Sequence, residues 1–391
     1  MGNRLWHSLD PFFSRVFGDD APTDPGSGWA AGVIAVLAGF LAAGGVLCFR
    51  FPAVLTAPGL RSLYPLPVLR AAIGLLIGAA IVLGLVSARL RRRKVLGLTG
   101  ICLGVAALVL GGPAAALPRQ IGPGPGLGFD WFLLNVLIMT LLYASLERAA
   151  PLRPEQPVFR KGWTTDGVHL LVSHVGVQVA SAVIVLPGQW LRRSILGGAG
   201  PSHAGALPFL FQLAAIVVIA DLCFYWIHRA FHSWPLLWRL HRIHHSNEQM
   251  DWLASERLHV VEIVIVRALV LTPLILIGFG QGPLLAYVTF ASVQAVLVHA
   301  NFRSKLAPRL GWVERILVTP RIHHLHHAAH GPAVDKNFAI HLPVLDRLFG
   351  TLYAPPGVWP TRTGVDGRPV PDGYWAQQLS PFGHRHGTGV Q

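Results

Sequence analysis

Histidines gather in one part of this chain at spacings that suit metal binding. Of the 19 histidines among 391 residues, thirteen fall between His228 and His341. Most belong to the strings HRAFH, HRIHH and HHLHH, whose relevant members are His228, His232, His241, His244, His245, His323, His326 and His327. On an α-helix, positions i, i+3 and i+4 share one face, so each string directs two or three imidazoles at one point. Such rings suit iron, copper, zinc or nickel, and eight are enough for two ions.

The remaining histidines divide by position. His299 and His259 each stand at the end of an apolar run, and we add both to the candidate ligands. His324 points about 100° away from the shared face of its string, which favours a structural role. His330 directly precedes Gly-Pro, so we do not count it as a ligand. We expect His169 and His174 to be packed or hydrogen-bonded to a ligand, and the following to be solvated: His7, His203, His384 and His386.

An aspartate continues one of these faces into an apolar run. Asp221, Tyr225, His228 and His232 follow one another at helical spacing. A carboxylate inside such a run is costly and usually functional. Its expected task is a hydrogen bond that orients a ligating imidazole, and the alternative is a tolerated polar residue near a cavity.

The elements that position these residues are long apolar helices. The chain is 52% hydrophobic and 13% charged, against about 25% charged in a soluble domain. Runs of about 20 apolar residues predict membrane-spanning helices. There are eight: Trp29–Phe49, Val68–Ala88, Val95–Gly112, Phe129–Leu146, Val168–Leu191, Pro208–Ile227, Val260–Ile277 and Pro283–Val298. The sequence thus predicts an all-α integral membrane protein, in which the last two short runs form a hairpin.

The distribution of lysine and arginine predicts the orientation of these helices. With the N-terminus inside, the inside loops hold eleven basic residues up to Lys161 and the outside loops hold five, and the string RLRRRK dominates the difference. Both termini and every histidine cluster are then cytoplasmic. The formal charge of +14 fits this signal or contact with anionic lipid, and we expect no nucleic-acid partner.

Composition also predicts the division of the chain. PLRPEQPVFRKG, which starts at Pro151, reads as a linker. We expect an N-terminal tail over 1–28, a membrane module of unassigned role over 29–150, a catalytic region over 151–355 and a loosely ordered tail over 356–391, which is rich in Pro, Gly and Arg. Cys48, Cys102 and Cys223 form no CxxC pair and read as apolar packing residues.

Seven motifs follow one another between Thr165 and Tyr353. They are DxxxYWxHRxxH from Asp221, HxxHHS from His241, RxHxxE from Arg257, HxNxR from His299, TPxxHxxHH from Thr319, DxN from Asp335 and DRLFGT from Asp346. In their order and spacing this part of the sequence resembles the fatty acid hydroxylase and sterol desaturase superfamily, whose members are integral-membrane di-iron oxygenases. Two positions depart from the family pattern. Phe338-Ala339 stands where Tyr-Gly is common, and Leu345 stands where Trp is common.

The resemblance implies a helical membrane fold with a cytoplasmic metal cap, two iron ions, a lipid substrate and dioxygen. It adds Asn301 and Asp335 to Asp221 and Tyr225 as residues that support the ligands. No haem or flavin motif is visible, so electrons would come from an external ferredoxin- or cytochrome-type donor. We expect the protein to lie in a bacterial inner membrane. The donor or lipid phosphates would meet the following basic residues: Arg239, Arg242, Arg303, Lys305, Arg309, Arg315 and Arg321.

Other functions fit the pattern less well. A metal transporter or storage protein would place ionisable ligands near mid-membrane, whereas these clusters follow the ends of apolar runs. A membrane zinc protease would carry HExxH, which is absent. A bis-histidine haem protein would pair histidines deep in opposing helices.

The sequence leaves open a sterol, a fatty acyl lipid, a carotenoid or an ether lipid as substrate, and hydroxylation or desaturation as the outcome.

Overall fold

The computed structural model describes residues 26–118, 120–122, 124, 126–196, 202–303, 311–367 and 369–383. Within these residues all regular structure is helical, and extended pairing is limited to isolated bridges from Pro151 to Phe302 and from Ala328 to Thr363. The predicted all-helical architecture is therefore confirmed for the described part of the chain.

Seven helices in the described part of the chain are long and apolar enough to cross a membrane. They are α3 (Trp29–Arg50), α5 (Leu66–Leu90), α6 (Val95–Val109) with its continuation to Ala114, α7 (Phe129–Ala149), α9 (Phe209–Ser233), α11 (Val260–Ile277) and α12 (Gln281–His299). Each overlaps one predicted apolar run. The remaining run falls in α8 (Trp163–Leu196), where many side chains lie outside the described part, so the count of eight stays a prediction.

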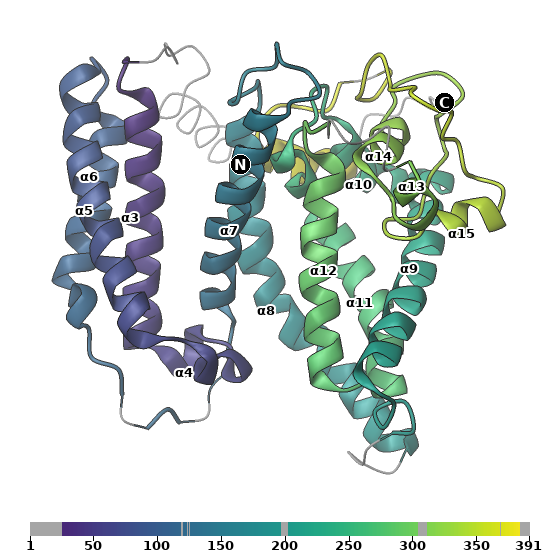
Figure 1. Cartoon of the computed structure of the whole chain (residues 1–391), viewed down its shortest axis with the longest axis horizontal. Coiled ribbons are helices and arrows are strands. Elements are labelled where there is room, and N and C mark those ends of the chain that lie inside the picture. The colour runs from purple at the N-terminus through teal and green to yellow at the C-terminus, as the bar shows by residue number, and fades with distance from the viewer. Residues whose placement is uncertain are drawn as a thin grey trace. The chain divides into compact units, whose positions relative to one another are not determined.

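The chain divides into two compact units, residues 1–138 and 139–391. The first contains α3, α5 and α6, which lie side by side (Figure 1). Their glycines allow this close approach, because a Cβ added to Gly97 would lie 2.4 Å from the carbonyl oxygen of Gly84. The short helices of this unit are α4 (Pro52–Leu55), η1 (Pro58–Leu63) and η2 (Gly112–Ala114).

The second unit packs its long helices through apolar contacts. Ile216 and Ala220 of α9 are fully buried against Leu274 of α11, in a cluster that also includes Tyr287 of α12. The division into units falls inside α7, because Met139 and Tyr143 pack with the α12 residue Val296. The predicted boundary at residue 151 lies after the end of that helix.

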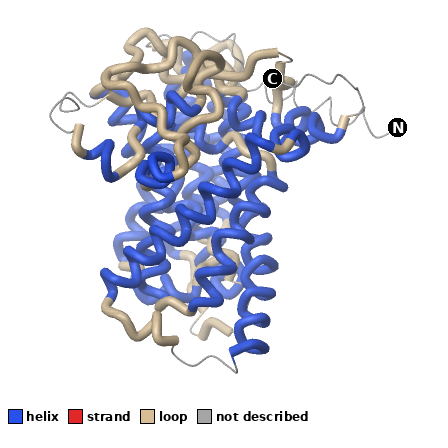
Figure 2. The backbone as a smooth tube through the Cα atoms, turned by 90° about the vertical axis from the view of Figure 1, so that its right-hand side faces the viewer, coloured by secondary structure: helices blue, strands red, loops and turns tan. Residues whose placement is uncertain are grey.

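Short helices and loops lie at one end of the long helices of the second unit (Figures 1 and 2). They are α10 (Pro235–His245), η3 (Trp252–Glu256), α13 (Val313–Ile316), α14 (Pro320–His326), α15 (Pro343–Leu348), α16 (Tyr374–Leu379) and η4 (Ser380–Phe382). We call this part the cap. Buried ion pairs fix it: Arg160 contacts Asp166 at 2.6 Å and Asp251 at 2.7 Å, and Arg257 contacts Asp166 at 2.5 Å.

The prediction of a loosely ordered C-terminal tail is wrong as far as residue 383. Tyr374 and Gln377 of α16 are buried, and the Gln377 side-chain oxygen lies 2.8 Å from Nε2 of His169. The side chain of Gln378 contacts the backbone at Leu258 and Val260. The prediction rested on the Pro, Gly and Arg content of the tail and gave no weight to its few aromatic and amide residues. Their contacts are enough to hold this segment against the rest of the unit.

Candidate metal centre

Four helices bring nine of the ten predicted ligands together. His228 and His232 end α9, the three histidines of HRIHH end α10, and His299 ends α12. The fourth helix, α14, carries the last string, whose His327 directly follows it. Prolines at the first turns of α10 and α14 start both helices where the chain turns back onto the cap. All nine rings are buried.

The nine rings form two groups. The five-histidine group comprises His228, His232, His241, His245 and His326, and the four-histidine group comprises His244, His299, His323 and His327. Within each group the candidate ligand atoms lie within 4.8 Å of one another. Two nitrogens that each lie about 2.1 Å from one ion are at most about 4.2 Å apart, so each group has nearly the dimensions of one ligand shell.

Hydrogen bonds at Nδ1 fix the tautomers of several rings. Nδ1 of His228 donates to the Phe338 carbonyl over 2.7 Å, Nδ1 of His299 to the Ala295 carbonyl over 2.7 Å, and Nδ1 of His326 to the Lys336 carbonyl over 2.8 Å. His244 makes a longer contact, 3.3 Å, to the carbonyl of Arg257 and so shares this arrangement. A neutral imidazole carries one proton, so Nε2 of each of these rings is a bare lone pair.

These lone pairs face one another. Nε2 of His299 lies 3.1 Å from Nε2 of His244 and 3.0 Å from Nε2 of His323. The Nε2 atoms of His228 and His241 are also 3.0 Å apart. Between His244 and His299 neither nitrogen has a proton to share, so the contact is repulsive unless a cation lies between them. The donor set therefore fits metal ions, and imidazole nitrogens suit iron among others.

Two further observations support this fit. Nε2 of His232 and Nε2 of His326 are buried and have no hydrogen-bond partner among the described residues, which is costly unless another ligand binds there. Burial, with added repulsion among the rings, lowers the pKa well below its ordinary value for the ligands outside the long helices: His241, His244, His245, His323, His326 and His327. These rings stay neutral at pH 7, the form that binds metal.

Two carboxylates hold rings of the five-histidine group. Oε1 of Glu262 accepts from Nδ1 of His241 at 2.6 Å, and both side chains are buried. Oδ1 of Asp335 lies 3.0 Å from Nδ1 of His232, with 53% of the aspartate side chain exposed. The predicted supporting role of Asp335 thus has a matching contact. Glu262 ends the RxHxxE motif of the sequence, but it was not predicted as a residue that supports a ligand, although an acid at the start of an apolar helix is a usable signal.

The DxN string forms a tight turn behind the α14 ligands. Asp335 has φ 53° and Asn337 has φ 60°, the left-handed conformation that non-glycine residues rarely adopt. The Asn337 side chain holds the turn, because its amide donates to the carbonyls of Ile322 and Tyr353 at 3.2 and 2.8 Å. This turn presents the Lys336 carbonyl to His326 and the Asp335 carboxylate to His232.

The prediction that Asp221 orients a ligating imidazole is wrong. Its carboxylate accepts the backbone N–H groups of three consecutive residues, Ile340 and His341 at 3.1 Å and Leu342 at 2.6 Å. Those donors surround the carboxylate within a fully buried site. Asp221 therefore fixes the segment that follows Phe338, and it acts on His228 only through that segment.

The side-chain hydrogen bonds of Tyr225 and Asn301 also go to residues other than the ligands. The Tyr225 hydroxyl lies 2.9 Å from Oγ1 of Thr351. The Asn301 side chain pairs with the backbone of Arg153, accepting at 2.9 Å and donating at 3.2 Å. The shared motifs place both residues close to ligands in the sequence but could not reveal these partners.

His259 is not part of either group, which corrects its prediction as a ligand. Its Nδ1 accepts from the backbone N–H of Val261 and caps α11, while Nε2 contacts the carbonyl of Gln378 at 2.9 Å. His324 lies outside the groups, as predicted, and contacts the His299 carbonyl. His169 is packed against the cap as expected, and His203 is exposed. The side chain of His174, with all of His7, His384 and His386, lies outside the described residues.

Comparisons with known proteins agree with this site. A model described as fatty acid hydroxylase matches residues 213–351, which include all nine clustered histidines. The ornithine lipid hydroxylase of Rhizobium tropici is 30% identical over 272 residues, which cover 65% of this chain and 76% of that protein. The alkylglycerol monooxygenase of Danio rerio is 29% identical over 204 residues, covering 50% of this chain and 44% of that protein. No solved structure matches the chain significantly.

Proposed function

Because this chain belongs to the fatty acid hydroxylase family, whose members are oxygen-dependent oxidoreductases acting on lipids, we propose that it holds two iron ions in its nine-histidine centre and hydroxylates the acyl part of a membrane lipid. The observation that carries the proposal is the pair of histidine groups, in which bare Nε2 lone pairs face one another at about 3 Å in a buried site. Zinc can replace iron at imidazole ligands in purified protein.

When bound by the nine histidines, two irons would supply the chemistry of dioxygen activation and of hydrogen removal from an unactivated carbon. The protein's own residues do the rest. Carbonyl and carboxylate groups at Nδ1 hold six of the nine rings and fix their tautomers, so these ligands need not rotate when the metal binds. The Phe338 ring packs 5.2 to 6.0 Å from the rings of His228, His232 and His326 and keeps water from that side of the centre.

The overall reaction needs electrons from outside the chain. Hydroxylation places one oxygen atom of dioxygen in a C–H bond and reduces the other to water, which consumes two electrons and two protons. Of the basic residues expected to meet an acidic donor, Arg239, Arg303 and Arg315 are exposed. Arg321 is corrected, because it is buried and paired with Glu314. Lys305 and Arg309 lie outside the described residues.

The relatives favour an acyl lipid as the first substrate to test. Their names report action on ornithine lipid and on alkylglycerol, both of which carry long alkyl chains. The ornithine lipid hydroxylase supports this choice most, since this chain covers 76% of its length. Desaturation stays the alternative outcome, because both reactions begin with removal of one hydrogen. Hydroxylation then adds oxygen at that carbon, whereas desaturation removes a hydrogen from the neighbouring carbon.

The proposal is tested by expressing the full chain in a host that makes ornithine lipid and analysing total lipid by mass spectrometry. The expected product is a lipid heavier by one oxygen atom, which carries the isotope when labelled dioxygen is supplied. A His326→Ala chain, produced at equal level, is the matched control and should leave the lipids unchanged. Equal lipid profiles with and without the intact chain, across hosts with acyl, ether and sterol lipids, would overturn the proposal.

We also propose that the cap and both termini face the cytoplasm of a bacterial cell. The arginine asymmetry supports this, because the RLRRRK string directly follows the apolar part of α5. Reporter fusions after residues 94, 248 and 391 should all report cytoplasm. An external report at 248 would contradict both the orientation and access of a cytoplasmic electron donor.

A further inference from the structure

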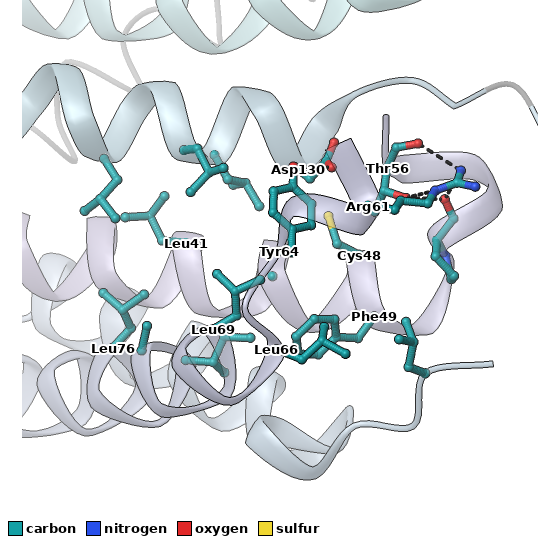
Figure 3. A pocket seen from close by; sticks show the side chains of 18 of the residues that line it. Leu41, Cys48, Phe49, Thr56, Arg61, Tyr64, Leu66, Leu69, Leu76 and Asp130 are labelled. Atoms are coloured by element: carbon teal, nitrogen blue, oxygen red, sulfur yellow. Dashed lines mark hydrogen bonds between the residues drawn. The ribbon is translucent and has the colours of Figure 1, made fainter. Parts of the chain in front are cut away.

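The N-terminal unit contains a pocket that no part of the proposed reaction uses. Its volume is about 190 Å³, and its walls come from α3, α5, the first half of α7, the segment around η1, and Leu117 and Ile121. Figure 3 shows the labelled polar side chains gathered toward one end and Leu41 and Leu76 at the other. All of its lining residues belong to residues 1–138.

The walls are apolar and belong to helices that can span a membrane. Leu41 of α3, Leu69 and Leu76 of α5, and Leu133 and Leu134 of α7 line it. The volume exceeds the roughly 150 Å³ of an engineered protein cavity that admits benzene, so an alkyl chain fits. An empty apolar pocket forfeits the dispersion contacts of its lining atoms, and a lipid chain restores them.

The polar end is built and rigid. Nε of Arg61 donates to the Thr56 hydroxyl at 2.7 Å, and Nη2 donates to the carbonyls of Pro52 and Thr56 at 2.9 and 3.0 Å. The Tyr64 hydroxyl donates to Oδ2 of Asp130 at 2.6 Å, and the Ala57 N–H donates to Oδ1. These hydrogen bonds involve Nε and Nη2 of Arg61, so Nη1 is a further charged donor at this end.

We propose that this pocket is a lipid-binding site that takes one acyl chain between its leucines and a head-group oxygen at Arg61. The occupant is a membrane lipid with a hydrogen-bond acceptor such as a phosphate or ester oxygen near the start of its chain. A guanidinium held by three hydrogen bonds loses little conformational freedom when it binds such an oxygen. The site is independent of the metal centre and assigns a binding role to a unit that the histidines do not explain.

The test uses the full chain purified in detergent and a phospholipid that carries a photoreactive diazirine in its acyl chain. In the wild-type protein, cross-links should concentrate on peptides that contain the lining residues of α3, α5 and α7. Ala72 lies in the pocket wall, whereas its neighbour Ala71 is exposed and outside the lining. Ala72→Phe should reduce these cross-links by about tenfold because it fills the pocket, and Ala71→Phe should leave them unchanged.

The head-group contact is tested separately. Arg61→Gln should weaken binding of phosphatidylglycerol by about tenfold, the effect of losing a charged hydrogen bond. Arg50→Gln, at an exposed position, is its control. Diacylglycerol, which lacks phosphate, separates phosphate recognition from ester recognition. The unfolding midpoint in detergent is measured for every variant, because an unchanged midpoint shows that the chain has folded and that a loss of lipid is local.

Three results would overturn the proposal. Cross-links spread evenly over the exposed helix faces would mean that lipid merely surrounds the protein. Equal cross-linking in Ala72→Phe and Ala71→Phe would exclude the pocket as the site of the chain. Unchanged phospholipid binding in Arg61→Gln would remove the head-group contact. A chain without oxygenase activity but with pocket cross-links would refute the proposed function and leave this inference standing.

Discussion

The two histidine groups differ in what holds their rings. In the five-histidine group, Glu262 and Asp335 supply carboxylates to Nδ1 of two rings. In the four-histidine group the observed Nδ1 acceptors are backbone carbonyls, and Nδ1 of His323 and of His327 is buried with no partner among the described residues. A carboxylate makes the opposite ring nitrogen a stronger donor to metal than a carbonyl does. We therefore expect two inequivalent metal positions, with tighter binding in the five-histidine group.

The largest effect on metal content and turnover should come from removing a single ligand ring, in one variant from the smaller group and in another from the larger group. His244→Ala leaves three rings in the smaller group and His326→Ala leaves four in the larger one. Both should lose at least one ion and all turnover while still inserting in the membrane, and the loss should be more complete for His244→Ala. Metal analysis per chain and lipid turnover measure this.

His203→Ala is the matched control, because this histidine is exposed and belongs to neither group. It should retain wild-type metal content and turnover. Full metal content in both cluster variants would contradict the ligand assignment, and equal losses in the two would contradict the ranking of the groups.

Exchanging the carboxylates sharpens the comparison. Glu262→Gln keeps an acceptor for His241 but removes the charge, and should lower metal affinity of the five-histidine group by about 10- to 100-fold, the range for such supporting residues. Asp335→Asn should have a smaller effect, because its side chain is 53% exposed and water screens its charge. Competition with a metal chelator measures both. A larger loss in Asp335→Asn than in Glu262→Gln would reverse this order.

The long helices and most ligands were predictable from sequence because periodicity governs both. Val260–Ile277 was predicted with the bounds that α11 has in the structure, and the spacing of HRIHH placed its three histidines on one helix end. Periodicity cannot assign a ring to a group, however. His244 belongs with His299 and His323, whereas its sequence neighbour His245 belongs with His228, since adjacent residues on a helix point about 100° apart.

Hydrogen-bond partners were the part that sequence could not supply. Asp221 looked like a partner of His228 on the same helix face, but the backbone of residues 340–342 satisfies its carboxylate. His259 looked like a ligand and caps α11. The bonds of Asp221 and the bond of His259 Nε2 reach segments about 120 residues away in the chain, so no local pattern could predict them.

A third prediction concerns Asp221, which supports the backbone of residues 340–342 and does not bind a ligand ring. Asp221→Asn should destabilise the protein by about 1–3 kcal/mol, because one amide oxygen replaces a carboxylate that accepts three N–H groups. Asp221→Leu should cost more, since all three donors then lack a partner. Unfolding in detergent measures the stability. Metal should be lost first from the five-histidine group, because the Phe338 carbonyl, which accepts from His228, belongs to the segment that Asp221 holds. A stability of Asp221→Leu equal to that of wild type would mean that these bonds contribute nothing.

The smallest effect should come from Phe338, where the family commonly has tyrosine. The Phe338 ring is 3% exposed and lies beside three rings of the five-histidine group, at 5.7 Å from His228 and 5.2 Å from His232. Phe338→Tyr adds a hydroxyl to this buried contact. Because the Phe338 carbonyl that anchors His228 belongs to the backbone, it is kept, and the ligand geometry should survive. We expect metal affinity of the five-histidine group to change by less than about tenfold and that of the four-histidine group not at all. Phe382→Tyr, on an exposed ring beside His259, is the control and should change neither. If Phe338→Tyr changed the metal affinity of the four-histidine group as much as that of the five-histidine group, the two groups would have to be treated as one coupled site.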